Sequence, residues 1–65
     1  MDTLKILKYK DLETINQYDG KDFIINLEEC DIKLRRRVMD FLCGHVQPNG
    51  KIEKISANEF IVKVK

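Results

Sequence analysis

The chain is poor in the residues that most catalytic and metal sites need. It has no tryptophan, one proline, one histidine, two cysteines and three glycines among its 65 residues. His45 and Cys43 lie two positions apart and supply at most two of the usual four ligands of a metal site. No third residue is apparent that would orient a Cys–His nucleophile pair, and the three glycines are not spaced to cradle a phosphate. The sequence therefore predicts no enzyme, no metal and no cofactor.

Disulfide bonds are also not expected. Cys30 and Cys43 flank one predicted helix, whose rise of about 1.5 Å per residue keeps the two sulfur atoms too far apart to bridge. We therefore expect both to be reduced and to behave as small, partly buried hydrophobic residues.

The sequence lacks both an excess of charge and a long apolar run. Twelve basic and eleven acidic residues leave a net charge of +1, whereas nucleic-acid-binding domains usually carry a strong basic excess. The one cationic cluster, Lys33 with Arg35 to Arg37, is either a solvated helix face or a patch for an anionic partner. No run approaches the ~20 apolar residues of a membrane-spanning helix, and the start has no signal-peptide pattern. These absences favour a cytoplasmic protein that binds no nucleic acid.

The length of the chain fits a single domain, residues 1–65. At 43% apolar and 35% charged residues, the composition is that of a folded domain. A chain this short buries only about 60% of the surface that its unfolded form exposes, so its stability as a monomer would be marginal. Oligomers commonly supply the missing stability in such small domains, and the sequence therefore favours self-association.

The main feature that is present is an amphipathic helix at residues 30–44. Its apolar residues recur at the spacing of one helix face: Leu34, Val38, Phe41 and Leu42. Asp31 can cap the start of this helix, and Gly44 can take the left-handed conformation that ends one. Ile32 and Met39 form a second, weaker apolar line, which suggests contact with a partner as well as with the sheet.

The rest of the chain alternates between strand and helix patterns. Asp11 is expected to cap a short helix at residues 12–18. The nearly continuous apolar run at 23–27 predicts an inner strand covered on both faces. Ile52 and Ile55 are three positions apart, which predicts a twist or a bulge near Lys54. The order βαβαββ predicts an α/β (α+β) domain with two helices packed on one sheet, and a right-handed crossover if the first two strands lie parallel. The expected elements are strands at residues 3–9, 23–27, 51–56 and 60–65, a helix at 12–18, and turns at 19–20, 47–50 and 57–58.

Four motifs from Asp22 onward resemble the SepF family of cell-division proteins. They are an apolar strand ending in Asn-Leu at 26–27, a helix ending in Asp-Phe-Leu-Cys-Gly at 40–44, the run Gly-Lys-Ile-Glu-Lys-Ile at 50–55, and Phe-Ile-Val at 60–62. They cover about two-thirds of the chain, in the order of the family and at nearly its spacing. The residues that carry the resemblance are Asn26, Leu27, Asp40, Phe41, Gly50, Ile52, Ile55 and Phe60.

The resemblance implies a non-enzymatic adaptor that forms homodimers and polymers at the division site. Such proteins bind the C-terminal tail of the tubulin-like division protein FtsZ and link it to the membrane. Their membrane contact is an N-terminal amphipathic helix joined by a linker to the core, whereas here Met1 leads straight into the first strand. We therefore expect membrane contact only through a segment absent from this chain. The family's usual extension past the last strand is also missing after Lys65.

Candidate contact residues for the dimer or for the tail lie on the central helix. They are Arg35, Arg36, Met39, Leu42 and Gly44. The arginines could meet acidic residues of the tail, and Met39 and Leu42 could line a groove between the helix and the last hairpin. Each apolar residue could equally be core, and Gly44 could be a simple helix cap. An alternative function is a small regulatory domain that binds a metabolite or RNA, and a third is a purely structural dimer.

Overall fold

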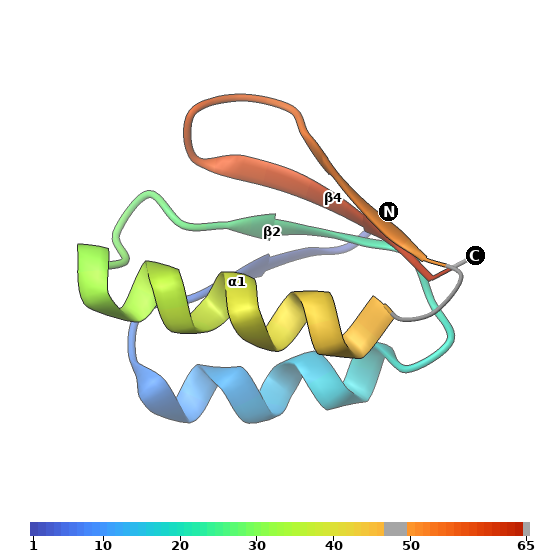
Figure 1. Cartoon of the computed structure of the whole chain (residues 1–65), viewed down its shortest axis with the longest axis horizontal. Coiled ribbons are helices and arrows are strands. Elements are labelled where there is room, and N and C mark those ends of the chain that lie inside the picture. The colour runs from blue at the N-terminus through green and yellow to red at the C-terminus, as the bar shows by residue number, and fades with distance from the viewer. Residues whose placement is uncertain (47–49, 65) are drawn as a thin grey trace.

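The computed structural model describes residues 1–46 and 50–64 of the chain, and Figure 1 shows their arrangement. The elements follow in the expected order of strand, helix, strand, helix, strand, strand, which confirms the α+β class. The turn expected at 47–50 falls mainly outside the described residues, as does Lys65. The elements are β1 (Thr3–Lys5), the 3-10 helix η1 (Tyr9–Tyr18), β2 (Phe23–Asn26), α1 (Ile32–Val46), β3 (Lys51–Lys54) and β4 (Glu59–Lys63).

The four strands form one mixed sheet in the order β1-β2-β4-β3. β1 and β2 pair in parallel, joined by the crossover through η1, and β4 pairs antiparallel with both β2 and β3. The strand β2 is therefore an inner strand. The C-terminal hairpin adds to β2 and not to β1, which leaves β1 and β3 at the two edges.

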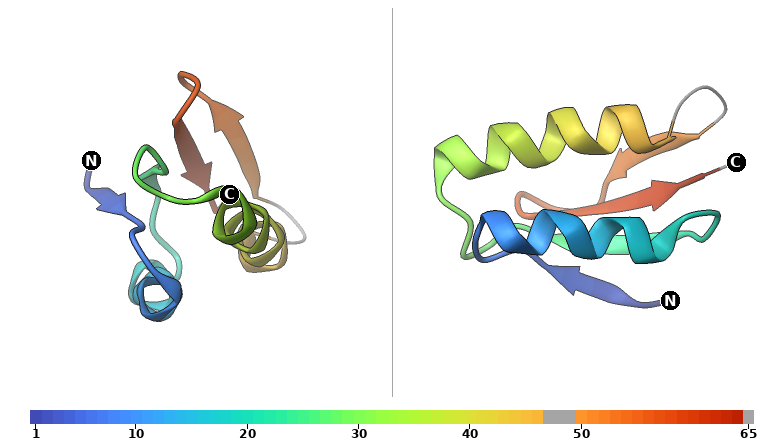
Figure 2. Two further views of the ribbon diagram at one scale, coloured as in Figure 1. Left: turned by 90° about the vertical axis from the view of Figure 1, so that its left-hand side faces the viewer. Right: turned by 90° about the horizontal axis from the view of Figure 1, so that it is seen from below.

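Both helices lie on the same face of the sheet (Figure 2). Phe23 of β2 stands opposite Val62 of β4, and both side chains are fully buried on the helix side. Ile24 and its opposite residue Ile61 point to the other face and are only half-buried. The expectation that β2 is covered on both faces is therefore wrong. We call the uncovered side the open sheet face.

The predicted apolar stripe of α1 forms the centre of the core. Leu34, Val38 and Leu42 are buried, and Val46 extends the stripe by one more turn. Burial of one such aliphatic side chain contributes about 1.5–3 kcal/mol, so the stripe is a main source of stability. Asp31 caps the helix as expected, because its Oδ1 accepts a hydrogen bond of 2.8 Å from the backbone N–H of Leu34.

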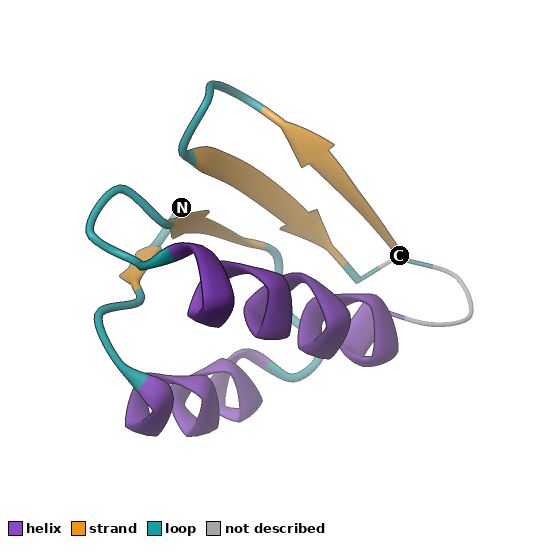
Figure 3. Ribbon diagram, turned by 60° about the vertical axis from the view of Figure 1, so that its left-hand side comes forward, coloured by secondary structure: helices purple, strands orange, loops and turns teal. Residues whose placement is uncertain are grey.

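The N-terminal third of the chain differs from the prediction. The strand at residues 3–9 is only Thr3–Lys5, and the helix expected at 12–18 begins earlier, at Tyr9 (Figure 3). Asp11 is therefore not the cap but the third helical residue, and its carboxylate reaches back to the backbone N–H groups of Leu7 and Lys8, at 2.8 and 3.0 Å. This carboxylate lets the helix start three residues sooner than its apolar pattern indicates. Asp19-Gly20 ends η1 as predicted, with Gly20 at a φ of 78°.

Two further boundaries need correction. Gly44 does not end α1, because the helix continues to Val46 and Gly44 has no positive φ. β3 has no bulge: Ile52 pairs with Val62 in regular register, and the strand stops at Lys54. Ile55 follows in the turn before β4, where 52% of the side chain is exposed. The broken alternation at Ile52 and Ile55 therefore marks the end of the strand.

Arg35 fastens the start of α1 to the β3–β4 turn. Its Nη2 donates hydrogen bonds to Ala57 O at 2.7 Å and to Asn58 Oδ1 at 2.8 Å. The same turn is joined to the end of β2, because Leu27 N–H donates to Asn58 O at 2.7 Å. One guanidinium thus connects helix and hairpin across more than twenty residues of sequence.

Gly50 lies where the chain enters β3 and has no room for a side chain. A Cβ added there would lie 2.6 Å from Val46 O and 2.7 Å from Val46 Cβ, and closer still to Lys63 O. Gly44 differs, since an added Cβ would meet nothing within 4 Å.

We expect Gly50→Ala to lower the free energy of unfolding by about 1–3 kcal/mol, because backbone must move to admit the methyl group. Gly44→Ala, a matched control inside a helix, should raise it by about 0.5–1 kcal/mol. Urea denaturation followed by circular dichroism measures both. Equal effects of the two substitutions would contradict this account of Gly50.

We expect Arg35→Ala to lower the free energy of unfolding by about 1–2 kcal/mol, because two hydrogen bonds from a charged donor are lost. Arg36→Ala removes the same side chain from an exposed position and should change stability by less than about 0.5 kcal/mol. The same urea titration compares them. If Arg35→Ala left the free energy of unfolding unchanged, the turn would not depend on this contact.

Candidate functional site

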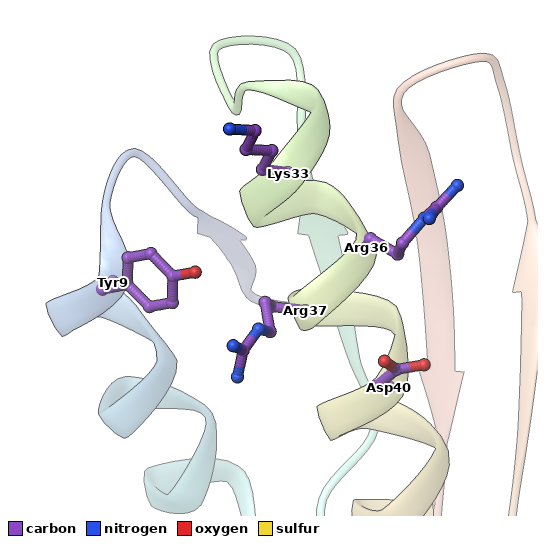
Figure 4. Close-up of a pocket in the computed structure, with 5 residues that line it drawn as sticks. All are labelled: Tyr9, Lys33, Arg36, Arg37 and Asp40. Atoms are coloured by element: carbon purple, nitrogen blue, oxygen red, sulfur yellow. The ribbon is translucent and has the colours of Figure 1, made fainter.

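Two adjoining cavities lie along the solvent side of α1, and we call them together the helix groove. The first has a volume of about 300 Å³ and the second about 340 Å³, and both are lined by Asp40. The first is also lined by Tyr9, Lys33, Arg36 and Arg37, and the second by Asn16, Phe41, Gly44 and His45. The groove therefore draws residues from both helices, and Figure 4 shows the first cavity.

The amphipathic pattern of α1 positions the groove residues. Since Leu34, Val38 and Leu42 face the sheet, the opposite side of α1 faces solvent. Its residues are all exposed: Lys33, Arg36, Arg37, Asp40 and Gly44. In Figure 4, Arg37 points toward η1, while Arg36 and Asp40 lie on the side away from it.

Tyr9 is held beside α1 by the start of η1. The carboxylate of Asp11 accepts hydrogen bonds from the two backbone N–H groups just before Tyr9. The bond from Leu7 N–H and then that from Lys8 N–H hold the pKa of Asp11 below its ordinary value. The carboxylate therefore stays ionised at neutral pH and keeps the aromatic ring at one end of the helix groove.

The first cavity carries a concentrated positive charge. Lys33, Arg36 and Arg37 are three and four positions apart, and each such like-charge pair destabilises a helix by about 0.2–0.5 kcal/mol. They lie in the first two turns of α1, where the helix dipole is also positive. None of them takes part in the ion pairs between described residues, and no such pair joins Arg36 to Asp40 one turn further on. This end of the groove is suited to an anionic group.

The second cavity is less charged. Phe41 is half-buried against the core, and the ring of His45 meets that of Phe23 edge-on at a centroid distance of 6.3 Å. The Nε2 atom of His45 is buried and has no hydrogen-bond partner among the described residues. The groove therefore changes along its length from cationic to partly apolar.

The structure separates the contact residues proposed from sequence. Arg36 and Gly44 line the helix groove, whereas Arg35 is bonded to the β3–β4 turn. Met39 is half-buried against the core, and Leu42 is fully buried. Both therefore fit the alternative in which they are core residues. Tyr9 falls in the strand predicted at 3–9 and so was not expected in the groove, whereas Asn16 lies within the predicted helix but has no pattern that marks a groove residue. In the sequence, Lys33 and Arg37 are recognisable only as members of the cationic cluster.

The motif residues of the resemblance serve mainly the fold. Leu27 is buried, and Ile52, Phe41 and Phe60 pack against the core. Asn26 Nδ2 donates to Glu59 Oε2 at 3.2 Å, and its Oδ1 accepts from Glu28 N–H at 3.0 Å. These contacts hold β2 to β4 and shape the connection to α1.

The described residues contain no group of three or more histidine, cysteine or acidic side chains that could hold a metal ion. Cys30 and Cys43 are both free thiols, and burial raises the pKa of Cys30, which disfavours the nucleophilic thiolate. Within residues 1–46 and 50–64, no helix is long and apolar enough to cross a membrane.

No protein-family model matches the chain. The chain is 48% identical over 44 residues to the cell division protein SepF of Lachnoclostridium phytofermentans. The match covers 66% of this chain, and the chain spans about a fifth of the length of that relative, 21%. The aligned 66% of the chain is as long as the stretch from Asp22 onward that carries the four motifs. The chain therefore belongs to the SepF family.

Proposed function

We propose that this chain is the core of a cell-division adaptor that binds the C-terminal tail of FtsZ and links it to the membrane at the division site. The proposal rests on family membership for the cell-division role and on the helix groove for tail binding. The groove runs from Lys33 to Gly44, which is about 17 Å along the helix axis. An extended peptide of about five residues has the same length.

The charges of the groove indicate how a tail would lie. Acidic residues of the peptide would meet Arg36 and its cationic neighbours in the first cavity. Apolar residues would meet Phe41 and the bare backbone at Gly44 in the second cavity, where the missing side chain leaves room for a close approach. The groove expected from sequence between α1 and the hairpin has less support. Arg35 is already bonded to the turn of that hairpin, and Leu42 is buried in the core.

The homodimer is a second part of the proposal, and the open sheet face supports it. Ile24 and Ile61 stand opposite each other at the centre of this face and are half-buried. Glu53 pairs with Lys63 at 2.8 Å on one side of them. Asn26 contacts Glu59 on the other. An apolar centre with a polar rim is the usual composition of a protein interface. Burial of this face in a second copy would supply the stability that so short a chain lacks.

We expect a calorimetric titration with the C-terminal tail peptide of FtsZ from the same organism to show saturable binding near one peptide per chain. Arg36→Glu should weaken it about tenfold or more, because an attractive charge becomes repulsive. Lys21→Glu makes the same charge change outside the groove, in the turn after η1, and should leave the affinity unchanged.

Absence of binding to a folded domain would remove the proposed function, although the fold and the family would stand. Binding of a nucleotide or RNA in place of the peptide would favour the alternative, a small regulatory domain.

We expect Ile61→Lys to shift the mass measured by light scattering toward the monomer, because it places a charge at the centre of the open sheet face. Ile55→Lys introduces the same residue in the exposed β3–β4 turn and should not change the mass. Gly44→Lys tests the helix groove as an interface, as first expected from sequence. A monomer from Gly44→Lys, with a dimeric Ile61→Lys, would move the interface from the sheet to the helices.

A further inference from the structure

Exposed apolar side chains gather at the end of the molecule where both helices begin. Five large apolar residues of the described chain are exposed, and three of them lie here: Leu7, Tyr9 and Ile32. Ile32 is 81% exposed, Tyr9 57% and Leu7 49%. Figure 1 shows the starts of η1 and α1 at one end, and Tyr9 and Lys33 line the same cavity. We call this region the helix-start edge.

Cationic side chains surround these apolar tips. Lys8 and Lys10 flank Tyr9, and Lys33 and Arg36 line a further cavity of about 220 Å³ together with Ile32. None of these four cations belongs to an ion pair between described residues. The helix-start edge therefore combines free positive charge with protruding apolar groups.

Three acidic residues near this edge are already engaged, whereas Asp40 lines the first cavity beside Lys33 and Arg36 without an ion pair among the described residues. The carboxylate of Asp11 accepts from Leu7 and Lys8, and that of Asp31 accepts from Leu34. Glu29 pairs with Lys5 at 2.6 Å. These three carboxylates thus satisfy backbone donors or another lysine and leave the cations of the edge without ion pairs among the described residues.

We propose that the helix-start edge docks on a membrane surface that contains anionic phospholipids. Apolar side chains that project from a cationic surface are suited to the boundary between head groups and acyl chains, about 5–10 Å deep. Lysine and arginine near the membrane surface are attracted to the negative head groups. A soluble anion or an acidic peptide would satisfy the cations but leave Ile32 and Leu7 in water, so the apolar tips favour a lipid surface.

This inference goes beyond the adaptor role, because it assigns a membrane contact to the core domain itself. The contact implied by the family resemblance comes from a segment outside the core. Tail binding in the helix groove and lipid binding at the helix-start edge are measured with different ligands, so either can fail while the other succeeds.

The test is flotation of the domain with phosphatidylglycerol–phosphatidylcholine vesicles, and with pure phosphatidylcholine vesicles for comparison. We expect binding to the anionic vesicles alone, weakened by added salt. The double variants Leu7→Ser/Ile32→Ser and Lys8→Glu/Lys33→Glu should each reduce binding about tenfold or more. The control Met1→Ser/Lys21→Glu makes the same two kinds of change away from the edge and should bind as the unmodified chain does.

The lack of tryptophan gives a second readout that does not depend on affinity. Tyr9→Trp should shift its emission to shorter wavelength when anionic vesicles are added, whereas Tyr18→Trp, which packs against Phe23, should not respond. No flotation with anionic vesicles would overturn the proposal. Binding that survives Leu7→Ser/Ile32→Ser and is displaced by inorganic phosphate would also overturn it, in favour of a soluble phosphate ligand.

Discussion

The packing of one helix stripe against one sheet face is the constraint on which the rest of this structure depends. Leu34, Val38 and Leu42 of α1 cover the side of the sheet on which Phe23 and Val62 are buried. A chain of 65 residues has few other apolar groups to bury, so the rotation of α1 about its axis is set by this contact. Once that rotation is set, the cations of the helix must face away from the sheet.

The same contact explains how neighbouring arginines acquire different roles. Arg35 follows Leu34 on the side of α1 that approaches the hairpin, and it bonds to the turn at Ala57 and Asn58. Arg36 and Arg37 are rotated further round and face solvent, Arg37 toward η1 and Arg36 away from it. A run of three identical side chains therefore contains one structural residue and two that are free for a partner.

Because the chain has only two helices and one sheet, three of its surfaces are not covered by other elements. The open sheet face has no helices, the helix groove separates α1 from η1, and the helix-start edge carries apolar tips. The open sheet face lies apart from the other two, whereas the groove and the edge share Tyr9, Lys33 and Arg36. A second copy on the sheet face therefore leaves the helix side of the domain free, whereas the proposed peptide and lipid surfaces meet at shared residues.

The sequence by itself determined the order of elements, the buried stripe of α1, the cap at Asp31 and the inner position of β2. These features depend on local periodicity and on side chains within one turn of each other, so they can be read along the chain. The early start of η1 was missed because Asp11 acts three residues ahead of its own position, and the end of β3 because Ile55 resembles a strand residue. Only the tertiary structure decided that Tyr9 lies beside Lys33, that Ile24 meets Ile61, and that Arg35 is engaged while Arg36 is free. Each of these depends on which elements more than twenty residues apart come together, and that is fixed by the burial of the whole apolar surface at once and not by any local pattern.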